Sequence, residues 1–139
     1  MTELELQAQV ADYLRLQYPN VLFHSDFGSG IKLTPGQAMR QKRLQGGRRS
    51  WPDMFIARPK LWLNEDEKPC YCHGLFIELK RPGVTIYKKD GNLVANKHIR
   101  EQAETLDDLR CAGYQAEFAC GFDEAKKIID EYLGEVKHG

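Results

Sequence analysis

Apolar residues recur along the chain with two periods, one typical of helices and one typical of strands. Near the N-terminus they return every three or four positions, which predicts an amphipathic helix over residues 3–17. Thr2 and Glu5 have the spacing of a capping box at the start of this helix. The predicted buried stripe of the helix consists of Leu6, Val10, Tyr13, Leu14 and Gln17.

Capping residues predict three further helices. Thr34-Pro35 is a favourable N-cap followed by a favourable first residue, which predicts a short helix over 36–44. A helix that begins near Ile99 is expected to end at Gly113. Asp123 is expected to cap a last helix that ends at Gly134.

Short apolar runs bounded by turn residues predict the strands. Residues 58–71 contain two prolines and an acidic run, so we expect a long exposed hairpin connection there. Asp90-Gly91 separates two short apolar segments, which predicts an extra hairpin over residues 84–96. The predicted order is α-β-α-β-β-(hairpin)-α-β-α, an α/β fold. The strands are predicted over residues 21–24, 54–57, 74–80 and 114–120.

Polar residues occupy the ends of two predicted strands. Asp53 precedes the first of them, and Glu78 and Lys80 end the second. Because side chains on a strand alternate, Glu78 and Lys80 share one face and Leu79 points to the other. If the two strands pair, Asp53 can lie on the Glu78 side, and two carboxylates beside one ammonium suit a divalent cation such as Mg²⁺. A Glu78–Lys80 ion pair on a solvated sheet face is the open alternative.

Length and composition indicate an ordinary globular domain. The 139 residues are 42% hydrophobic and 29% charged, and we expect a single domain over residues 1–139. No apolar run approaches the roughly 20 residues that cross a bilayer, and the acidic N-terminus does not resemble a secretory signal. We therefore expect a cytoplasmic location without a membrane partner.

The net charge is zero, yet the basic residues are clustered. Two windows around the predicted site hold most of them, and such clusters fit a polyanionic partner, although a solvated surface is the alternative. The predicted DNA-binding residues are Lys32, Arg40, Lys42, Arg43, Arg48, Arg49, Arg81, Lys88 and Lys89. Lys80 is expected to act at the site instead, and Arg81 to point to the opposite face of the strand.

Two other groups of residues suggest chemistry less directly. Cys70-x-Cys72-His73 is spaced too tightly for a usual zinc site, and we expect no zinc. Glu3 falls on the core-facing side of the first helix, whereas Glu5 has a sufficient structural role in the cap. Gln102 lies on the apolar stripe of its helix, where a buried amide bonded to the backbone is the structural explanation.

The ordered set of motifs resembles the PD-(D/E)XK nucleases, and among them the virus-type replication-repair nuclease (VRR-NUC) domains. Pro52-Asp53 followed by Glu78-Leu79-Lys80 is similar to the nuclease signature. The flanking Gly46-Gly47-Arg48-Arg49-Ser50-Trp51, the segment His73-Gly74-Leu75-Phe76-Ile77 and the later Gln102 are similar to that branch in the same order. The resemblance implies a restriction-endonuclease-like core, a central mixed sheet flanked by helices, with the 84–96 hairpin as an addition after the catalytic strand.

The resemblance also implies an activity and roles for the site residues. It implies an endonuclease that cleaves DNA with Mg²⁺ or Mn²⁺, held by Asp53, Glu78 and the Leu79 carbonyl. Lys80 would position the attacking water, and Glu3 and Gln102 would complete the site. Small stand-alone members resemble Holliday-junction resolvases, which implies branched DNA as substrate, a homodimer and a viral or phage setting. The alternative from another class is a DNA-binding or assembly module with a nuclease-like fold and no cleavage.

Overall fold

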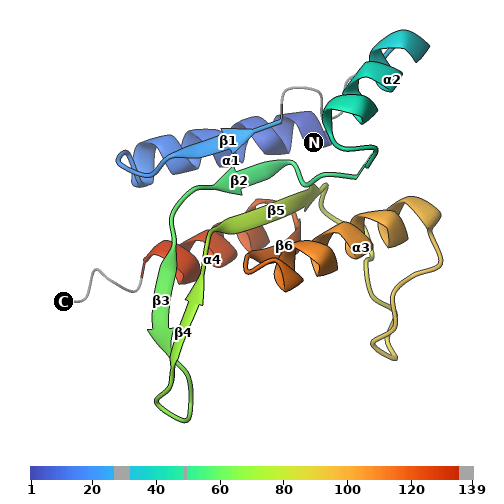
Figure 1. Ribbon diagram of the computed structural model, residues 1–139. Helices are drawn as coiled ribbons and strands as arrows, with labels where there is room; N and C mark the ends of the chain where they lie inside the picture. The colour runs from blue at the N-terminus through green and yellow to red at the C-terminus, as the bar shows by residue number, and fades with distance from the viewer. Residues whose placement is uncertain (27–31, 49, 135–139) are drawn as a thin grey trace.

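The chain folds around a four-stranded sheet in the computed structural model, which describes residues 1–26, 32–48 and 50–134 (Figure 1). A separate two-stranded ribbon extends from this sheet. In chain order the elements are α1 (Glu3–Gln17), β1 (Phe23–Ser25), α2 (Pro35–Leu44), β2 (Met54–Ile56), β3 (Lys60–Leu63), β4 (Pro69–Cys72), β5 (Leu75–Lys80), α3 (Lys97–Cys111), β6 (Gln115–Cys120) and α4 (Phe122–Leu133).

The central sheet is mixed, as predicted, with the strand order β1-β2-β5-β6. β1 pairs antiparallel with β2, and β2 pairs antiparallel with β5. β5 and β6 are parallel, since α3 carries the chain back between them. β5 therefore has a neighbouring strand on each side, which explains why five of its six residues are buried.

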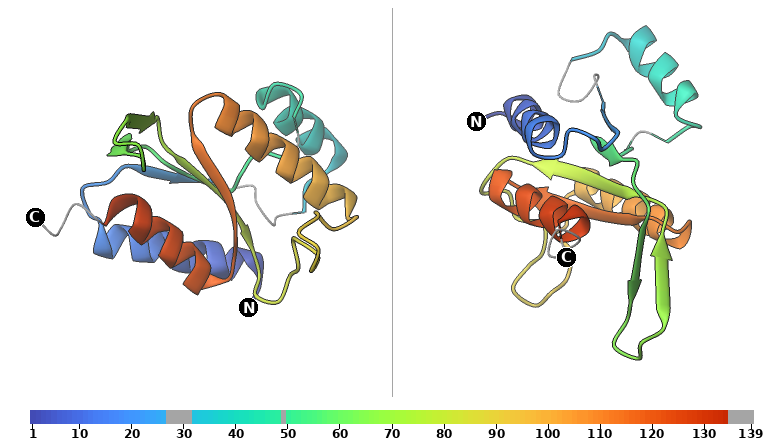
Figure 2. Two further views of the ribbon diagram at one scale, coloured as in Figure 1. Left: turned by 90° about the horizontal axis from the view of Figure 1, so that it is seen from below. Right: turned by 90° about the vertical axis from the view of Figure 1, so that its left-hand side faces the viewer.

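Helices cover both faces of the sheet, so the expected α/β architecture is confirmed (Figure 2). α1 and α4 lie side by side on one face and enclose the main core, which includes Leu14, Ile77 and Ile129. α3 covers the other face, where Leu106 and Ala116 belong to a second cluster. Within the described ranges, none of the helices is both long and apolar enough to cross a bilayer.

The first helix matches its prediction at its start and differs at its end. The Thr2 hydroxyl accepts a hydrogen bond from the Glu5 amide, and the Glu5 carboxylate accepts one from the Thr2 amide, both at 3.0 Å, which confirms the capping box. The prediction that Gln17 is buried was wrong. Gln17 is the last residue of α1, and the next residue, Tyr18, packs against the core instead. The buried residues of α1 are Leu6, Gln7, Val10 and Leu14.

Two other helix starts show what each cap contributes. Thr34 caps α2 as predicted and forms a capping box with Gln37. The N-cap of α4 is Gly121 rather than the predicted Asp123, which lies in the first turn. Gly121 has a φ of 87°, a backbone conformation that glycine adopts without strain, so the turn from β6 determines where α4 begins. Asp123 still suits this place, because a carboxylate is favourable at the positive end of a helix.

The connection over 58–71 is more regular than predicted, and the predicted 84–96 hairpin is less regular. The connection predicted over 58–71 contains β3 and β4, which pair antiparallel and project away from the sheet (Figures 1 and 2). In the segment 84–96, all of which the structure describes, one isolated bridge between Tyr87 and Leu93 replaces a regular ribbon. Its turn is closed by a hydrogen bond of 2.9 Å from the Gly91 amide to the Lys88 carbonyl.

Candidate active site

Two acidic side chains and a lysine lie together where β2 begins and β5 ends. Glu78 and Lys80 alternate with Leu79 on β5, so they share the face of the sheet that α3 covers. Their exposed fractions are only 4% and 5%, and that of Asp53 is 8%. The alternative of an ion pair on a solvated sheet face is therefore wrong. Burial of charged groups is costly, so their joint burial requires mutual compensation.

The register of β2 and β5 explains why Asp53 reaches this group. Met54 pairs with Ile77, so continuing the antiparallel register places Asp53 opposite Glu78. Residues directly opposite in such a pair have neighbouring side chains on one face. The Asp53 carboxylate accepts a hydrogen bond of 2.7 Å from the Leu79 amide, which fixes its position against β5.

Pro52 ends the ladder at the next position and leaves room for a ligand. In the same register Pro52 is opposite Leu79. The N–H and C=O groups of one strand residue point to the same neighbouring strand, so the Leu79 carbonyl faces the side on which its amide meets Asp53. Proline has no amide hydrogen, so it cannot donate to this carbonyl. Asp53 thus provides a carboxylate, and Pro52 leaves the Leu79 carbonyl without a hydrogen bond from its own backbone.

The pKa of Glu78 shows that Lys80 does not fully offset the effects of burial and of Asp53. Burial raises the pKa of the Glu78 carboxyl well above its usual range, and the charge of Asp53 with a hydrogen bond between the two side chains raises it further. The Lys80 ammonium lowers this pKa, and Glu3 contributes a small increase. A bound cation would oppose the effect of Asp53 and favour the ionised form of Glu78.

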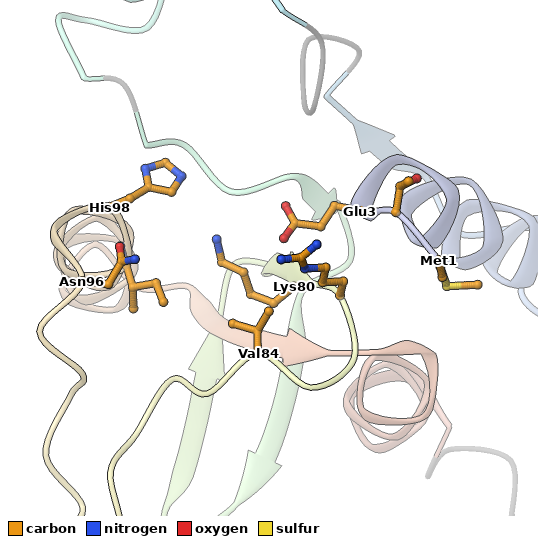
Figure 3. Close-up of a pocket in the computed structure, with 9 residues that line it drawn as sticks. Met1, Glu3, Lys80, Val84, Asn96 and His98 are labelled. Atoms are coloured by element: carbon orange, nitrogen blue, oxygen red, sulfur yellow. The ribbon is translucent and has the colours of Figure 1, made fainter.

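Glu3 lies at the start of α1 and shares a cavity of about 410 Å³ with Lys80 and His98. Figure 3 shows Glu3 and Lys80 extending into this space, with His98 across from them. Glu5, in contrast, is occupied in the capping box. Arg81 also lines this cavity, beside Lys80. β5 ends at Lys80, and the alternation of a strand no longer applies beyond it.

Gln102 reaches this region from α3, next to a histidine that sequence analysis missed. Its side chain is buried, and its Nε2 lies 3.1 Å from His98 Nε2. The side-chain oxygen of Gln102 has no hydrogen-bond partner among the residues that the structure describes. The amide is thus bonded to a histidine of the cavity wall rather than to the backbone. His98 lies one helical turn before Gln102, a spacing that could have indicated it.

Gln7 is a second residue that was not among the predicted site residues. It lies one turn after Glu3 on α1, and its side-chain amide donates to the Ser25 hydroxyl at 2.5 Å and to the Asp26 carbonyl at 2.8 Å. The Asp26 amide in turn donates to the Asp53 carbonyl at 2.7 Å. These bonds connect the helix that carries Glu3 to the strand start that carries Asp53.

Most of the predicted DNA-binding residues are exposed in two regions beside the site. One region includes α2, and the other follows β5. Arg49 lies outside the described residues, so its prediction has no structural counterpart here. The exposed residues are Lys32, Arg40, Lys42 and Arg43 in the first region and Arg81, Lys88 and Lys89 in the second.

Arg48 has a structural role that its place in a basic cluster did not suggest. Its guanidinium donates to the Thr105 hydroxyl at 2.8 Å and to the Asp108 carboxylate at 2.6 Å, both on α3. The Ser50 and Thr105 hydroxyl oxygens are 2.7 Å apart. These contacts attach the segment before Asp53 to α3, so Arg48 helps to position the strand start.

The donor set at the sheet edge fits a hard divalent cation. Asp53, Glu78 and the Leu79 carbonyl offer oxygen atoms, which Mg²⁺ prefers together with water and phosphate oxygens. Within the described ranges, no group of three or more His, Cys, Asp or Glu side chains forms a possible metal site. A cation here would therefore depend on two carboxylates and a backbone oxygen, a pattern typical of Mg²⁺ sites that bind phosphate.

One of three comparisons with known proteins identifies a protein of similar fold. No protein-family model matches the chain, and no curated protein matches it either. A solved structure described as "VRR_NUC domain protein" superimposes with a TM-score of 0.59 at 24% sequence identity. The match covers 96% of this chain and 88% of that chain. The chain therefore has the fold of a VRR-NUC-type nuclease domain.

Proposed function

We propose that this protein is a metal-dependent endonuclease that hydrolyses phosphodiester bonds in DNA. One observation carries the proposal: Asp53, Glu78 and Lys80 are buried together at a sheet edge. A site without a function would have no reason to keep three buried ionisable side chains, because apolar residues of similar size are often at least as stable. The nuclease-domain description of the similar solved structure also supports it.

In this proposal the metal ligands and Lys80 have different tasks. Asp53, Glu78 and the Leu79 carbonyl would hold Mg²⁺ or Mn²⁺, which stabilises negative charge on phosphate oxygens and lowers the pKa of a bound water. Lys80 orients the attacking water and offsets the charge that develops on the phosphate. Glu3 accepts a hydrogen bond from water in the shared cavity, and Gln102 holds His98 in the cavity wall.

The reaction in this proposal is a hydrolysis. The water oxygen forms a bond to phosphorus, and the bond between phosphorus and the leaving sugar oxygen breaks. One proton of the water is taken up at the site, and a proton passes to the sugar oxygen. The carboxylates and the lysine act on these atoms from buried positions, where electrostatic effects are stronger than in bulk water.

The substrate proposed is branched DNA of replication or repair, cut by a homodimer whose two sites meet two strands. The exposed basic residues on α2 and after β5 support a nucleic-acid partner, because phosphate contacts dominate such binding. A cleavage panel tests both parts of this proposal. Four-way junctions, flaps, duplex and single strands are incubated with the protein in Mg²⁺, Mn²⁺ or EDTA. Analytical ultracentrifugation of the same protein measures its oligomeric state.

We expect cleavage with either metal, none in EDTA, and faster cleavage of the branched substrates. Equal cleavage of every substrate would contradict the branched preference and leave the nuclease proposal standing. Tight DNA binding without cleavage under any metal would favour the alternative, a DNA-binding module that has the nuclease fold. A monomer in solution would contradict the paired-site arrangement.

A further inference from the structure

A second cavity adjoins the candidate active site and has a different character. Its volume is about 450 Å³, within the range of about 300–1,000 Å³ that is usual for ligand sites. Asp53 lines it, yet it shares no lining residue with the cavity that contains Lys80. Three aromatic side chains also line it, those of Trp51, Phe55 and Phe76.

The three aromatic rings form a cluster that remains partly open to solvent. The rings of Phe55 and Phe76 are stacked with their centroids 4.5 Å apart, and the Trp51 ring lies 6.0 Å from Phe76. Trp51 is 38% exposed, and both phenylalanines are only partly buried. Trp51 therefore does not cover Phe55 and Phe76 completely, and part of the aromatic surface remains in contact with water. Exposed apolar surface of this kind commonly marks a binding site.

The indole of Trp51 is held in place although it is exposed. Its Nε1 donates a hydrogen bond of 3.2 Å to the Gln45 carbonyl, and its ring contacts Phe76. A ring held by a hydrogen bond and an aromatic contact loses less conformational entropy than a free ring when a ligand stacks on it. The exposed ring is thus preorganised as a flat surface for another planar group.

The surroundings favour a ligand that carries phosphate. Gln45 lines the cavity together with Asp26 and Asp53. Gln45 also lines a neighbouring cavity, which contains the exposed Lys42 and Arg43 of α2. Asp53, on the same cavity, is a ligand of the proposed metal at the cleaved phosphate. A planar group flanked by phosphates on both sides is a nucleobase within a DNA strand. Stacking of such bases on aromatic side chains is the common mode of single-strand binding.

We propose that this cavity binds an unpaired nucleobase next to the cleaved phosphate, and that Trp51 stacks on it. The choice of ligand rests on the proposed nuclease function. Bases in an intact duplex are paired and stacked, and moving one into a pocket requires breaking those contacts. The cavity therefore favours DNA with an unpaired nucleotide at the cut, and Trp51 becomes a specificity-determining residue.

Binding by variants of the full chain tests the proposal without any cleavage step. The probes are a fluorescent thymidine octamer and a fully paired duplex of equal length, titrated in Ca²⁺ and followed by anisotropy. Trp51→Ala should weaken octamer binding about tenfold, since stacking on one aromatic ring is worth roughly that much, while Trp51→Phe should stay within about threefold. Duplex binding should change less than about twofold in both variants.

A second measurement does not depend on whether Trp51→Ala folds. The chain has two tryptophans, so the Trp62→Phe variant carries Trp51 as its single tryptophan reporter. The octamer should quench the fluorescence of this variant, and an octamer of abasic sugar phosphates should not. The matched control is the Trp51→Phe variant, in which Trp62 on the projecting ribbon should respond to neither probe.

Two outcomes would overturn the proposal. One is an equal loss of octamer and duplex binding in Trp51→Ala, which would make Trp51 a structural residue of the DNA interface. The other is the absence of quenching by octamer concentrations that saturate binding. These results are separable from the nuclease proposal. A protein that binds the base but does not cut DNA would still show quenching of Trp51. A nuclease without this base-binding pocket would cut DNA and show no quenching.

Discussion

At the scale of single residues, Lys80 has the most informative environment. It is 5% exposed and lies beside Glu78, whose pKa it lowers against the effects of burial and Asp53. An exposed lysine that only attracts phosphate would need no such arrangement. This burial connects the strand pattern of the sequence to a role in the chemistry at the sheet edge.

Replacing Lys80 should separate chemistry from binding. Lys80→Ala should lower cleavage at least about a hundredfold, because it removes a positive charge from the site of reaction. Junction binding in Ca²⁺ should weaken only a few-fold, with a change in salt slope of about one, since one phosphate-type contact at most is lost. Single-turnover cleavage and anisotropy measure the two quantities. Proportional losses of affinity and rate would instead identify Lys80 as a phosphate clamp.

The two acidic residues of the first helical turn should differ in their effects. Glu3→Gln should slow cleavage more than Glu5→Gln, because Glu3 lines the cavity with Lys80 and Glu5 is bonded to Thr2. Glu5→Gln should change both rate and melting temperature little, since glutamine also serves in a capping box. Parallel cleavage assays of the two variants provide the comparison. The opposite ranking would mean that the acid on α1 acts through its cap rather than through the site.

The sequence predicted these residues only where a local rule connected them. Strand alternation put Glu78 and Lys80 on one face, and the helical period separated Glu3 from Glu5. The helical spacing of His98 and Gln102 was a local rule of the same kind, whereas the partners of Arg48 followed from none. Arg48 meets Thr105 and Asp108 only after α3 has packed on the sheet, so its basic neighbours suggested DNA instead.

At the scale of elements, α2 is built differently from the other helices. None of its ten residues, all of which the structure describes, is buried, and it projects away from the sheet (Figure 2). Its stability therefore comes largely from the capping box of Thr34 and Gln37 and from its first-turn proline. An unpacked helix with basic residues is suited to contact a partner rather than to support the core.

Removing charge from α2 should affect binding before chemistry. Arg40→Ala combined with Arg43→Ala should weaken junction binding about tenfold at moderate salt and lower the salt slope by about two, one for each phosphate contact. Cleavage by the saturated complex should remain nearly unchanged. The matched control is Arg15→Ala with Lys127→Ala, which removes two exposed charges from α1 and α4. An equal loss of affinity in the control would mean that total charge matters and α2 does not.

Element predictions succeeded where period and capping agreed. α1, α2 and α3 begin close to their predicted positions, and β5 differs from its prediction by one residue. The two strands of the β3–β4 ribbon were not predicted, because their apolar residues do not alternate with a buried face: Leu61 and Leu63 are exposed. The 84–96 segment has turn residues typical of a hairpin, but no third strand supports it, and its pairing is limited to one bridge.

At the scale of the whole molecule, contacts between α1 and α4 hold the N-terminal helix against the core. The hydroxyls of Tyr13 and Tyr18 donate to one Asp130 oxygen at 2.5 and 2.6 Å, and Lys126 donates to the other at 3.0 Å. Burial alone would raise the pKa of Asp130, but these three donors outweigh it and lower the pKa. Asp130 thus stabilises the fold most strongly in its ionised form.

The stabilisation by Asp130 should depend on pH. Because the pKa is lower in the folded state, the contribution is present above the unfolded value of about 3.9 and is lost as pH falls through the folded value. Asp130→Asn should reduce the free energy of unfolding by about 1.5–3 kcal/mol at pH 7, as for a hydrogen bond to a charged group. Urea unfolding at pH 7 and pH 3 measures this difference. A gap between wild type and variant that persists at the lower pH would contradict the ionic origin.

The central claim is that Asp53 and Glu78 form a metal-dependent cleavage site, and single-turnover cleavage of a four-way junction by Asp53→Asn and Glu78→Gln tests it most directly. Both changes remove charge at nearly constant volume, so circular dichroism and DNA binding in Ca²⁺ should remain close to wild type. We predict that cleavage in Mg²⁺ falls at least about a hundredfold in each variant. A rate near that of the wild-type protein in either correctly folded variant would contradict the claim.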